Sequence, residues 1–426
     1  MEDSVGKIRK GKASGTLAVI AYRNIWRNMR RTALCIVAVA IAVFFNIFMQ
    51  AMINGMVKGI EDVVRIFDTG HVNVVSAQFE EEREYVPVQF PVADGRSTTE
   101  LIADIEAIPG VRAALPRITA YATLSDSVVK HALLWGIDIG REMEINNFNI
   151  SERSDGLVTG RYPEAGSNEC AIGVYLAKKA GLNIGDRIPL KVVSAQFSDK
   201  YWSPVITGFF EYDYRKFDEE TILVSFDRLQ RLLVMDDSTQ QLFIYADDVR
   251  ESGTIAARVR MLLGGNVVRE WGDNYWVALM RQSSVVYVIV YLVFQIVASF
   301  LIVNTVLMVI HERIKEIGMM GSLGMTRGEI VTVFFFEAVF LSVIGSLIGC
   351  AAGAVSTGIG SLFPIPIDTF TGGGLKEFPM AGTIFLDFSP LTVAEGFLFG
   401  VIVSSLCTLL PSLKSAFIEP VEALRR

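Results

Sequence analysis

The chain has 426 residues, of which 51% are hydrophobic and 20% are charged, and its formal net charge is −7. The charged fraction is too high for a bundle of membrane helices alone, and the hydrophobic fraction is high for an ordinary soluble protein. The composition therefore predicts a membrane protein with a sizeable soluble part, and the negative charge argues against nucleic acid as a partner.

Apolar segments long enough to cross a bilayer occur at residues 32–57, 283–310, 330–357 and 391–410. The first two contain no charged side chain, whereas the third contains Glu337 and the fourth Glu395. About 20 apolar residues span a hydrocarbon core of roughly 30 Å, so each segment is predicted to be a transmembrane helix. A cleaved signal peptide is the alternative for the first segment, although its apolar stretch is longer than is usual for such a peptide.

Positive charge before the first span sets the predicted orientation. Eight lysines and arginines in residues 1–31 are opposed only by Glu2 and Asp3, and such segments stay in the cytoplasm. Part of this stretch, residues 17–31, is either a helix lying in the headgroup region or a plain basic flank. Counting spans forward places residues 311–329 and the tail 411–426 inside, and residues 58–282 and 358–390 outside.

Residues 58–282 form the predicted soluble part. Short runs rich in β-branched residues alternate there with helical patterns such as 98–108, which is typical of an α+β domain. Cys170 is its only cysteine, so it contains no internal disulfide. The predicted fold is a membrane α-helical protein with four transmembrane helices and a large extracytoplasmic α+β domain inserted between helices 1 and 2.

Motifs for catalysis or cofactor binding are absent from the sequence. The only histidines, His71, His131 and His311, have no second ligand at a spacing suited to a metal. No phosphate-binding G-x-x-x-x-G-K-[ST] loop and no G-x-S-x-G nucleophile motif occurs. We therefore expect no catalytic, cofactor-binding or metal site in this chain, and we do not expect an enzyme.

The inner loop, residues 311–329, carries an amphipathic pattern. Ile314, Ile317 and Gly321 share one helical face, and charged residues occupy the rest. Glycines at positions 318, 321 and 324 weaken a helix by about 1 kcal/mol each relative to alanine. Close approach of another protein surface is one explanation, and a helix that ends at Gly318 with a flexible turn beyond it is the other.

The third span contains a stripe of small residues. Gly345, Gly349 and Gly353 repeat every four residues, which permits close helix packing, either against another span of the same chain or across a dimer seam. Glu337 lies two turns earlier on much the same face and is predicted to point into protein. An ion path is the alternative role for Glu337, but no second charge lies midway along the other spans.

The sequence resembles the permease subunits of the MacB, FtsX and LolC/LolE type, which form the type VII, mechanotransmission class of ABC transporters. Four features carry the resemblance: the basic, aromatic entry at 21–28, the glycine-containing stretch 136–186, the loop E-R-I-K-E-I-G-M-M-G-S-L-G-M at 312–325, and the ending E-P-V-E-A-L-R at 419–425. The family often has Arg-Ala where this chain has Gly321 and Ser322. The resemblance covers nearly the whole chain.

This resemblance implies a MacB-like periplasmic core in the external domain, two paired permease chains, identical or paralogous, and a multi-pass location in the bacterial inner membrane with both termini cytoplasmic. ATP is expected in a cytoplasmic ABC ATPase dimer, since no ATPase is fused to this chain. The residues expected to couple to that ATPase are Glu312, Arg313, Glu316, Ile317, Gly318, Gly321 and Gly324.

The expected function is the release or extraction of lipoproteins, or of another hydrophobic cargo, with a possible periplasmic carrier or adaptor as a further partner. A MacB-like efflux permease is the close alternative, and an FtsX-like regulator of cell-wall hydrolases is the third. A membrane-anchored sensor or adhesin would need no glycine-rich inner loop, and a membrane enzyme would need a reactive constellation. The sequence names no cargo and no cargo-binding residue.

Overall fold

The computed structural model describes residues 19–23, 29–92, 95–124, 129–146, 156–312, 319–366 and 382–416. The chain divides into two compact units. The first, which we call the helical unit, comprises Met1–Gly55, Ser283–Pro364 and Phe385–Arg426. The second, the sheet domain, comprises Met56–Gln282 and Ile365–Ile384.

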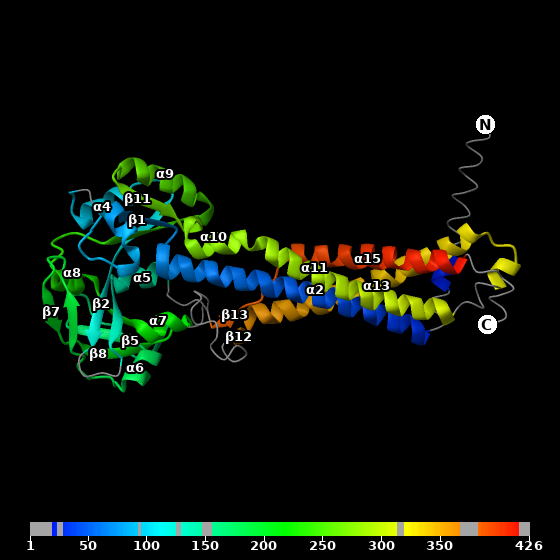
Figure 1. Ribbon diagram of the computed structural model, residues 1–426, viewed down its shortest axis with the longest axis horizontal. Helices are drawn as coiled ribbons and strands as arrows, with labels where there is room; N and C mark the ends of the chain where they lie inside the picture. Colours follow the sequence, from blue (N-terminus) through cyan, green and yellow to red (C-terminus); the bar gives the residue numbers. More distant parts are fainter. Residues whose placement is uncertain are drawn as a thin grey trace. The chain divides into compact units, whose positions relative to one another are not determined.

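Long helices make up the helical unit (Figure 1): α2 (Met29–Val63), α11 (Ser284–Glu312), α13 (Arg327–Leu362) and α15 (Pro390–Ala416). Among the described residues, four helices are long and apolar enough to cross a membrane, which agrees with the predicted number. α15 packs against both α13 and α11. A shared apolar cluster joins Val43 of α2, Cys350 of α13 and Phe397 of α15.

The helices are longer than the apolar segments that predict them. α2 continues beyond residue 57 to Val63, through Lys58 and Glu61, because charged side chains end an apolar run without breaking a helix. α13 begins at Arg327, where Thr326 and Glu329 form a capping box. Of the predicted headgroup segment 17–31, residues 19–23 and 29–31 are described and are helical, and the second stretch is the start of α2.

One mixed sheet forms the centre of the sheet domain, and its described strands follow the order β11-β1-β10-β2-β3-β9-β5-β8-β4, with β6 paired to β2 and β7 paired to β6. Two pairs, β3–β9 and β5–β8, are parallel, and the other pairs are antiparallel. The strands are β1 (Val72–Ser76), β2 (Val111–Leu124), β3 (His131–Ile137), β4 (Leu157–Gly160), β5 (Glu169–Gly173), β6 (Leu190–Val193), β7 (Asp199–Trp202), β8 (Val205–Phe210), β9 (Thr221–Ser225), β10 (Gln241–Ala246) and β11 (Asn266–Glu270).

Helices cover this sheet, which confirms the predicted α+β class. They are α3 (Ala77–Glu81), α4 (Thr98–Glu106), α5 (Ile139–Ile145), α6 (Val174–Ala180), α7 (Arg215–Glu220), α8 (Phe226–Leu233) and α9 (Ser252–Leu262), whereas α10 (Tyr275–Gln282) contacts the short helix η4 (Trp271–Asp273). The predicted helical pattern at 98–108 corresponds to α4, which Ser97 and Glu100 cap. A two-stranded sheet, β12 (Ile365–Pro366) with β13 (Thr383–Ile384), lies apart from the main sheet.

Separate apolar clusters stabilise the sheet domain. One joins α6 and α8 to the sheet through Leu176, Leu229 and Ile222. Another joins α4 and α9 to it through Ile105 and Val259. All four cysteines are free, and Cys170 is buried, so this domain depends on its apolar core, as the sequence predicts.

Candidate functional site

The inner loop is described in part. Arg313, Glu316, Ile317 and Gly318 lie outside the described residues, and Glu312 ends α11. Residues 319–322 are helical. Of the residues expected to couple to the ATPase, the structure describes Glu312, Gly321 and Gly324.

Gly324 ends this helical turn. Its φ of 91° lies in the left-handed region that favours glycine. Its N–H donates to Gly321 O at 3.1 Å, and the N–H of Met325 donates to Met320 O at 3.2 Å. These two bonds form a Schellman motif, in which glycine is the preferred residue. Gly324 therefore ends this helical turn. Residues 319–322 are helical, so the alternative of a flexible turn directly after Gly318 does not fit them.

The same turn presents apolar side chains to its surroundings. Leu323 is 82% exposed and Met319 is 53% exposed. Met320 and Met325 instead pack on Ile330 and Phe334 of α13. A fixed turn that is anchored on one side and exposes large apolar groups on the other is suited to binding a second protein.

The glycine stripe of α13 lies against α2 of the same chain. A Cβ atom added at Gly345 would lie 2.8 Å from Val39 Cβ, and one added at Gly349 would lie 2.6 Å from Ala40 O. Gly353 approaches Ile47 in the same way, at 3.1 Å. Real Cβ atoms do not tolerate the first two distances, so these glycines allow the two helices to approach closely. Glu337, on the same helix, is 5% exposed.

Polar side chains that the sequence analysis did not single out join three helices of the helical unit. The Tyr291 hydroxyl on α11 bonds to Asn46 Oδ1 at 3.0 Å and lies 3.3 Å from Gln50 Oε1, both on α2. Gln50 Nε2 donates to Glu395 Oε2 of α15 at 2.9 Å. The signal in the sequence was the pair of amides four residues apart in an apolar segment, which places them on one helical face.

Beside this network is an apolar hollow of about 320 Å³. Ile41, Phe45 and Met49 of α2 line it together with Phe294 and Val297 of α11. A hollow of this size and composition in a membrane helix pair is suited to an acyl chain.

In the sheet domain, the chain that follows α2 is a π-helical segment, η1 (Val64–Thr69). Such segments are rare and are frequent at functional sites. The fully buried Arg117 of β2 donates from Nη1 to the Ile66 carbonyl at 2.8 Å. The Tyr245 hydroxyl of β10 reaches Arg65 O at 3.4 Å. We call Arg117, Glu142 and Tyr245 together the η1 clamp.

Arg117 is held by a two-point ion pair with Glu142 of α5. Arg117 Nε lies 2.6 Å from Oε1 and Nη2 lies 2.8 Å from Oε2, and both side chains are fully buried. The guanidinium also lies 3.9 Å from the centre of the Phe243 ring and 4.5 Å from the Trp135 ring. Bidentate geometry and aromatic faces are what an arginine needs to remain charged away from water.

These contacts affect the ionisation of the clamp. Burial tends to lower the pKa of Arg117, but the charges and hydrogen bonds of Glu142 and Tyr245 together outweigh it, so the pKa is raised above its ordinary value. Burial raises the pKa of Tyr245, so its hydroxyl stays protonated. Arg117 therefore carries its positive charge, with a neutral phenol beside it, across the physiological range of pH.

Aromatic rings enclose the other side of η1. Phe67 lies with its ring centre 4.7 Å from that of Phe217, 5.9 Å from Tyr212 and 6.0 Å from Trp135. These distances are typical of favourable aromatic pairs. The end of the helix that begins as α2 is thus fixed in the sheet domain both by hydrogen bonds and by a buried aromatic contact.

Comparison with known proteins agrees with this architecture. The model of the MacB-like periplasmic core domain matches residues 32–262, and that of the FtsX-like permease C-terminal domain matches residues 288–420. The first match covers α2 and most of the sheet domain, and the second covers nearly all of the last three long helices, in the order that the resemblance predicts.

Among individual relatives, the lipoprotein-releasing system transmembrane protein LolC of Xylella fastidiosa is 24% identical over 340 residues, which are 74% of this chain and 78% of that protein. The ABC transporter permease YknZ of Bacillus subtilis is 32% identical over 191 residues, 42% of each chain. The macrolide export ATP-binding/permease protein MacB of Agrobacterium fabrum is 28% identical over 131 residues, 31% of this chain and 18% of that protein. The chain therefore belongs to the family of ABC transporter permeases that includes MacB, FtsX and LolC.

Proposed function

We propose that this permease couples ATP hydrolysis in a separate ATPase subunit to movement of its sheet domain, and that it releases or extracts lipoproteins from the inner membrane. The observation that carries the cargo assignment is the length of the likeness to LolC, which extends over 78% of that protein. The likeness to MacB covers 18% of that relative. Efflux is therefore the second candidate.

In the proposed arrangement the sheet domain is an extracytoplasmic insertion between the first and second membrane helices. The eight positive charges of residues 1–31 support a cytoplasmic N-terminus, and an even number of spans then places the C-terminus on the same side. The membrane is the bacterial inner membrane.

ATPase docking is proposed at the inner loop. The exposed side chains of Met319 and Leu323 would enter an apolar groove of the ATPase, and Glu312, Arg313 and Glu316 would supply charged contacts at its rim. Ile317, Gly318 and Gly321 would allow close approach of the partner. ATP itself would bind only in the ATPase dimer, and this chain would hold no cofactor.

Transmission is proposed to run along α2 itself. This helix is continuous from Met29 to Val63 and leads directly into η1, which the clamp bonds to the strands of the sheet. A shift of a continuous helix moves both of its ends, because its backbone hydrogen bonds are stiff over this length. Closure of the ATPase dimer on ATP would therefore move α2, and this movement would reach the sheet domain through η1.

A second permease, identical or paralogous, is proposed to complete the transporter. The glycines at 345, 349 and 353 already contact α2 within the chain, so they favour packing inside one chain rather than a role at a dimer seam. Among the side chains of α11 that the structure describes, most of the apolar ones are exposed, including Val288, Leu292 and Ile296, and we assign this surface to the second permease. A periplasmic carrier or adaptor would meet the sheet domain.

Affinity purification in mild detergent, followed by mass spectrometry, tests the proposed machine. We expect recovery of an ATPase together with lipid-modified proteins. Recovery of an ATPase with a periplasmic adaptor and without lipoproteins would favour efflux, and the absence of any ATPase would contradict the transporter function.

Docking is tested in proteoliposomes that contain the recovered ATPase. Glu316→Lys, Gly318→Trp and Leu323→Asp should each uncouple ATP hydrolysis from release while the protein still inserts. Ser322→Ala is the control, because the Ser322 hydroxyl donates to Met319 O at 2.9 Å, within its own helical turn. Full coupling in all three variants would exclude the inner loop as the docking surface.

A further inference from the structure

A short stretch of chain before α15, residues 382–387, is bonded to the sheet domain at its first residues. We call this stretch the strap. The Asp213 carbonyl accepts from Gly382 N at 2.8 Å, and Asp213 Oδ2 accepts from Thr383 N at 3.2 Å and from the Thr383 hydroxyl. Hydrogen bonds to a carboxylate are stronger than those to a neutral acceptor. Asp213 therefore holds the start of the strap through both its backbone and its side chain.

Asp213 itself lies in a closed loop between β8 and α7. Its φ of 61° is left-handed, a conformation that aspartate adopts more readily than most residues. Around it, Tyr212 N donates to Asp218 Oδ1 at 3.0 Å, and Asp218 N donates to Tyr214 O at 3.0 Å. Asp218 is 1% exposed, so these bonds are shielded from water. We call residues 211–218 the anchor loop.

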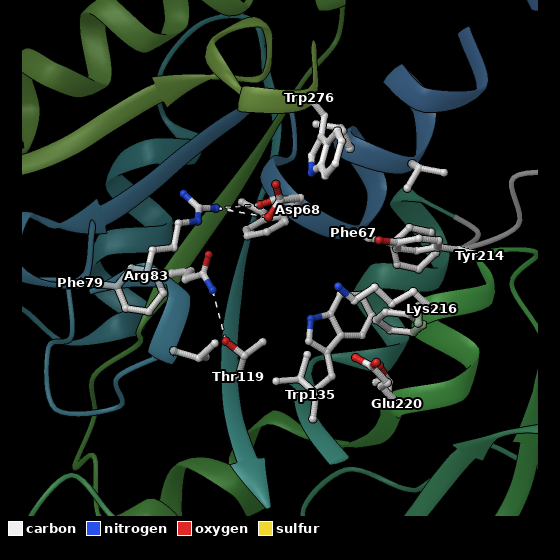
Figure 2. Close-up of a pocket in the computed structure, with 18 residues that line it drawn as sticks. Phe67, Asp68, Phe79, Arg83, Thr119, Trp135, Tyr214, Lys216, Glu220 and Trp276 are labelled. Carbon is white, nitrogen blue, oxygen red and sulfur yellow. Dashed lines mark hydrogen bonds and ion pairs between the residues drawn. The ribbon is translucent and has the colours of Figure 1, made fainter. Parts of the chain in front are cut away.

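The anchor loop also packs against η1. The ring centre of Phe67 lies 5.6 Å from that of Tyr214 and 5.9 Å from that of Tyr212. Figure 2 shows Phe67 and Tyr214 beside each other, at one side of a cavity of about 290 Å³. Since α2 leads directly into η1, the anchor loop touches the end of α2 and is bonded to the strap as well.

The middle of the strap is buried against the end of α2. Ile384 is 5% exposed and lies in an apolar cluster with Ile60 of α2 and Val64 of η1. It also pairs with Ile365, which follows α13, in the two-stranded sheet of β12 and β13. Removal of this side chain from water favours the position of the strap beside α2.

Further along, the strap lies against the backbone of α2. A Cβ atom added at Gly55 would collide with Phe385 O, so glycine is required for this close approach. Asp387 N donates to Ala51 O at 3.1 Å. Later residues of the strap thus meet earlier residues of α2, which means that the strap runs antiparallel to the helix.

α13 holds the far end of the strap too. Leu386 is 2% exposed, and its N–H donates to Gly360 O at 3.1 Å. The boundary between the helical unit and the sheet domain falls at Gly55–Met56 in α2 and at Ile384–Phe385 in the strap. The strap is therefore a connection between the units that is bonded at both of its ends.

We propose that Asp213 is a positioning residue of the transporter, which fastens the strap to the sheet domain so that a shift of α2 and α13 reaches the anchor loop at a second attachment beside η1. The inference rests on the proposed coupling to an ATPase and adds to it the residue at which the segment between α13 and α15 takes part. Both attachments act on one loop, because Phe67 and Thr383 contact the same residues 211–218.

Hydrogen exchange of the full chain in lipid nanodiscs, without any ATPase, tests the attachment by itself. Asp213→Gly removes the carboxylate while glycine keeps the left-handed backbone, so exchange in peptides that cover the strap should become about tenfold faster. Thr383→Val removes only the hydroxyl bond and should have a smaller effect. Asp213→Asn keeps an acceptor oxygen and should restore most of the protection.

A matched control comes from a second aspartate of the same domain. Asp236 also has a left-handed backbone, with a φ of 48°, and it follows α8 rather than β8. Asp236→Gly should leave exchange of the strap unchanged. Unchanged exchange in peptides from β10 shows that each variant is folded. Strap exchange in a folded Asp213→Gly variant that equals that of the parent would overturn the proposal.

The transmitting role is tested with the recovered ATPase present, by comparing exchange without nucleotide and after trapping with ATP and vanadate. In the parent, we expect trapping to change exchange both at residues 319–325 and in the anchor loop. In Asp213→Gly the change at 319–325 should persist, whereas the change in the anchor loop should fall about threefold or more, a loss well within that of one charge-assisted hydrogen bond.

The outcomes separate this inference from the proposed function. A change in the anchor loop that is as large in Asp213→Gly as in the parent would overturn the role of Asp213 and leave the coupling to an ATPase standing. A parent in which only residues 319–325 respond would do the same. A parent in which neither region responds would contradict the proposed coupling, and the transmitting role of Asp213 with it.

Discussion

The helical unit and the sheet domain are held together in different ways. In the helical unit, close contacts are made by small residues, with Gly345 and Gly349 bringing α13 against α2. In the sheet domain, large side chains make the central contacts, and the fully buried Arg117 bonds to Glu142 and packs on Phe243. One unit is stabilised by shape and close approach, and the other by burial of large apolar and paired charged groups.

This difference suits the two units to different tasks. Helices that meet through smooth surfaces of small residues can shift by a small amount without breaking specific bonds. The η1 clamp cannot shift in this way, because separating a buried ion pair leaves a charge without a partner. We therefore expect motion to arise in the helical unit and to be passed on, rather than absorbed, at η1.

Breaking the clamp should have the largest effect. Arg117→Met leaves Glu142 buried without its partner and should lower the free energy of unfolding of the sheet domain by about 3–5 kcal/mol. The double variant Arg117→Met/Glu142→Met should recover most of that loss, since no buried charge remains. Arg250→Met removes an ion pair in which Arg250 is 87% exposed, and it should leave stability unchanged. Urea unfolding followed by tryptophan fluorescence measures all three, and equal stability of Arg117→Met and the parent would refute the role of the clamp.

Acidification should weaken the sheet domain through His71. Nδ1 of this half-buried side chain accepts from Ala246 N at 2.9 Å. Burial, and then the charge of Arg65, lower its pKa from 6.5 to about 4. The unfolded chain therefore takes up a proton first as pH falls, so stability is fully present above about pH 6.5 and is lost as pH falls toward about 4.

The expected loss from this histidine is at most about 3 kcal/mol. His71→Gln should flatten the pH dependence of the free energy of unfolding in this window, whereas His131→Gln, at an exposed position on β3, should retain it. An unchanged pH profile in His71→Gln would show that another group is responsible.

Glycine substitutions test how tightly α13 meets α2. Gly349→Ala places a methyl group 2.6 Å from Ala40 O and should destabilise the helical unit by about 1–3 kcal/mol. Gly358→Ala lies on the same helix with no described atom within 4 Å of the new methyl group, so it should stabilise by about 0.5–1 kcal/mol. Apparent melting temperatures in detergent provide the measurement. The same sign of change in both variants would argue against close packing at Gly349.

Loss of the polar contact between α2 and α11 should have the smallest effect. Tyr291→Phe removes the hydrogen bonds to Asn46 and Gln50, and such bonds between membrane helices contribute about 0.6 kcal/mol on average. The same detergent melting assay should show a shift smaller than that of Gly349→Ala. A larger shift would mean that this network, rather than the glycine contacts, holds the helical unit together.

Local patterns made parts of this structure predictable. The apolar runs predicted the four long helices, and Ser97 and Glu100 mark the start of α4, because both signals depend on residues close in the chain. The stripe from Gly345 to Gly353 predicted close packing, but its period alone left the choice between α2 and a second chain open.

Contacts distant in the chain could not be predicted in this way. Arg117 is 25 residues from Glu142 and 51 residues from Ile66, and only the folded sheet brings them together. Gly324 is a different example. The sequence predicts that it couples to the ATPase, and the structure shows in addition that it ends a helical turn.

The most direct test of transmission through η1 compares lipoprotein release with ATP hydrolysis in proteoliposomes. Arg117→Lys keeps a positive charge beside Glu142 but loses the fork that also reaches Ile66 O, so the sheet domain should remain folded while its bond to η1 is weakened. If motion is transmitted through η1, ATP hydrolysis persists while release falls by about tenfold or more, in line with the loss of a charge-assisted hydrogen bond. Release at the rate of the parent protein, in a variant shown to be folded, would contradict it.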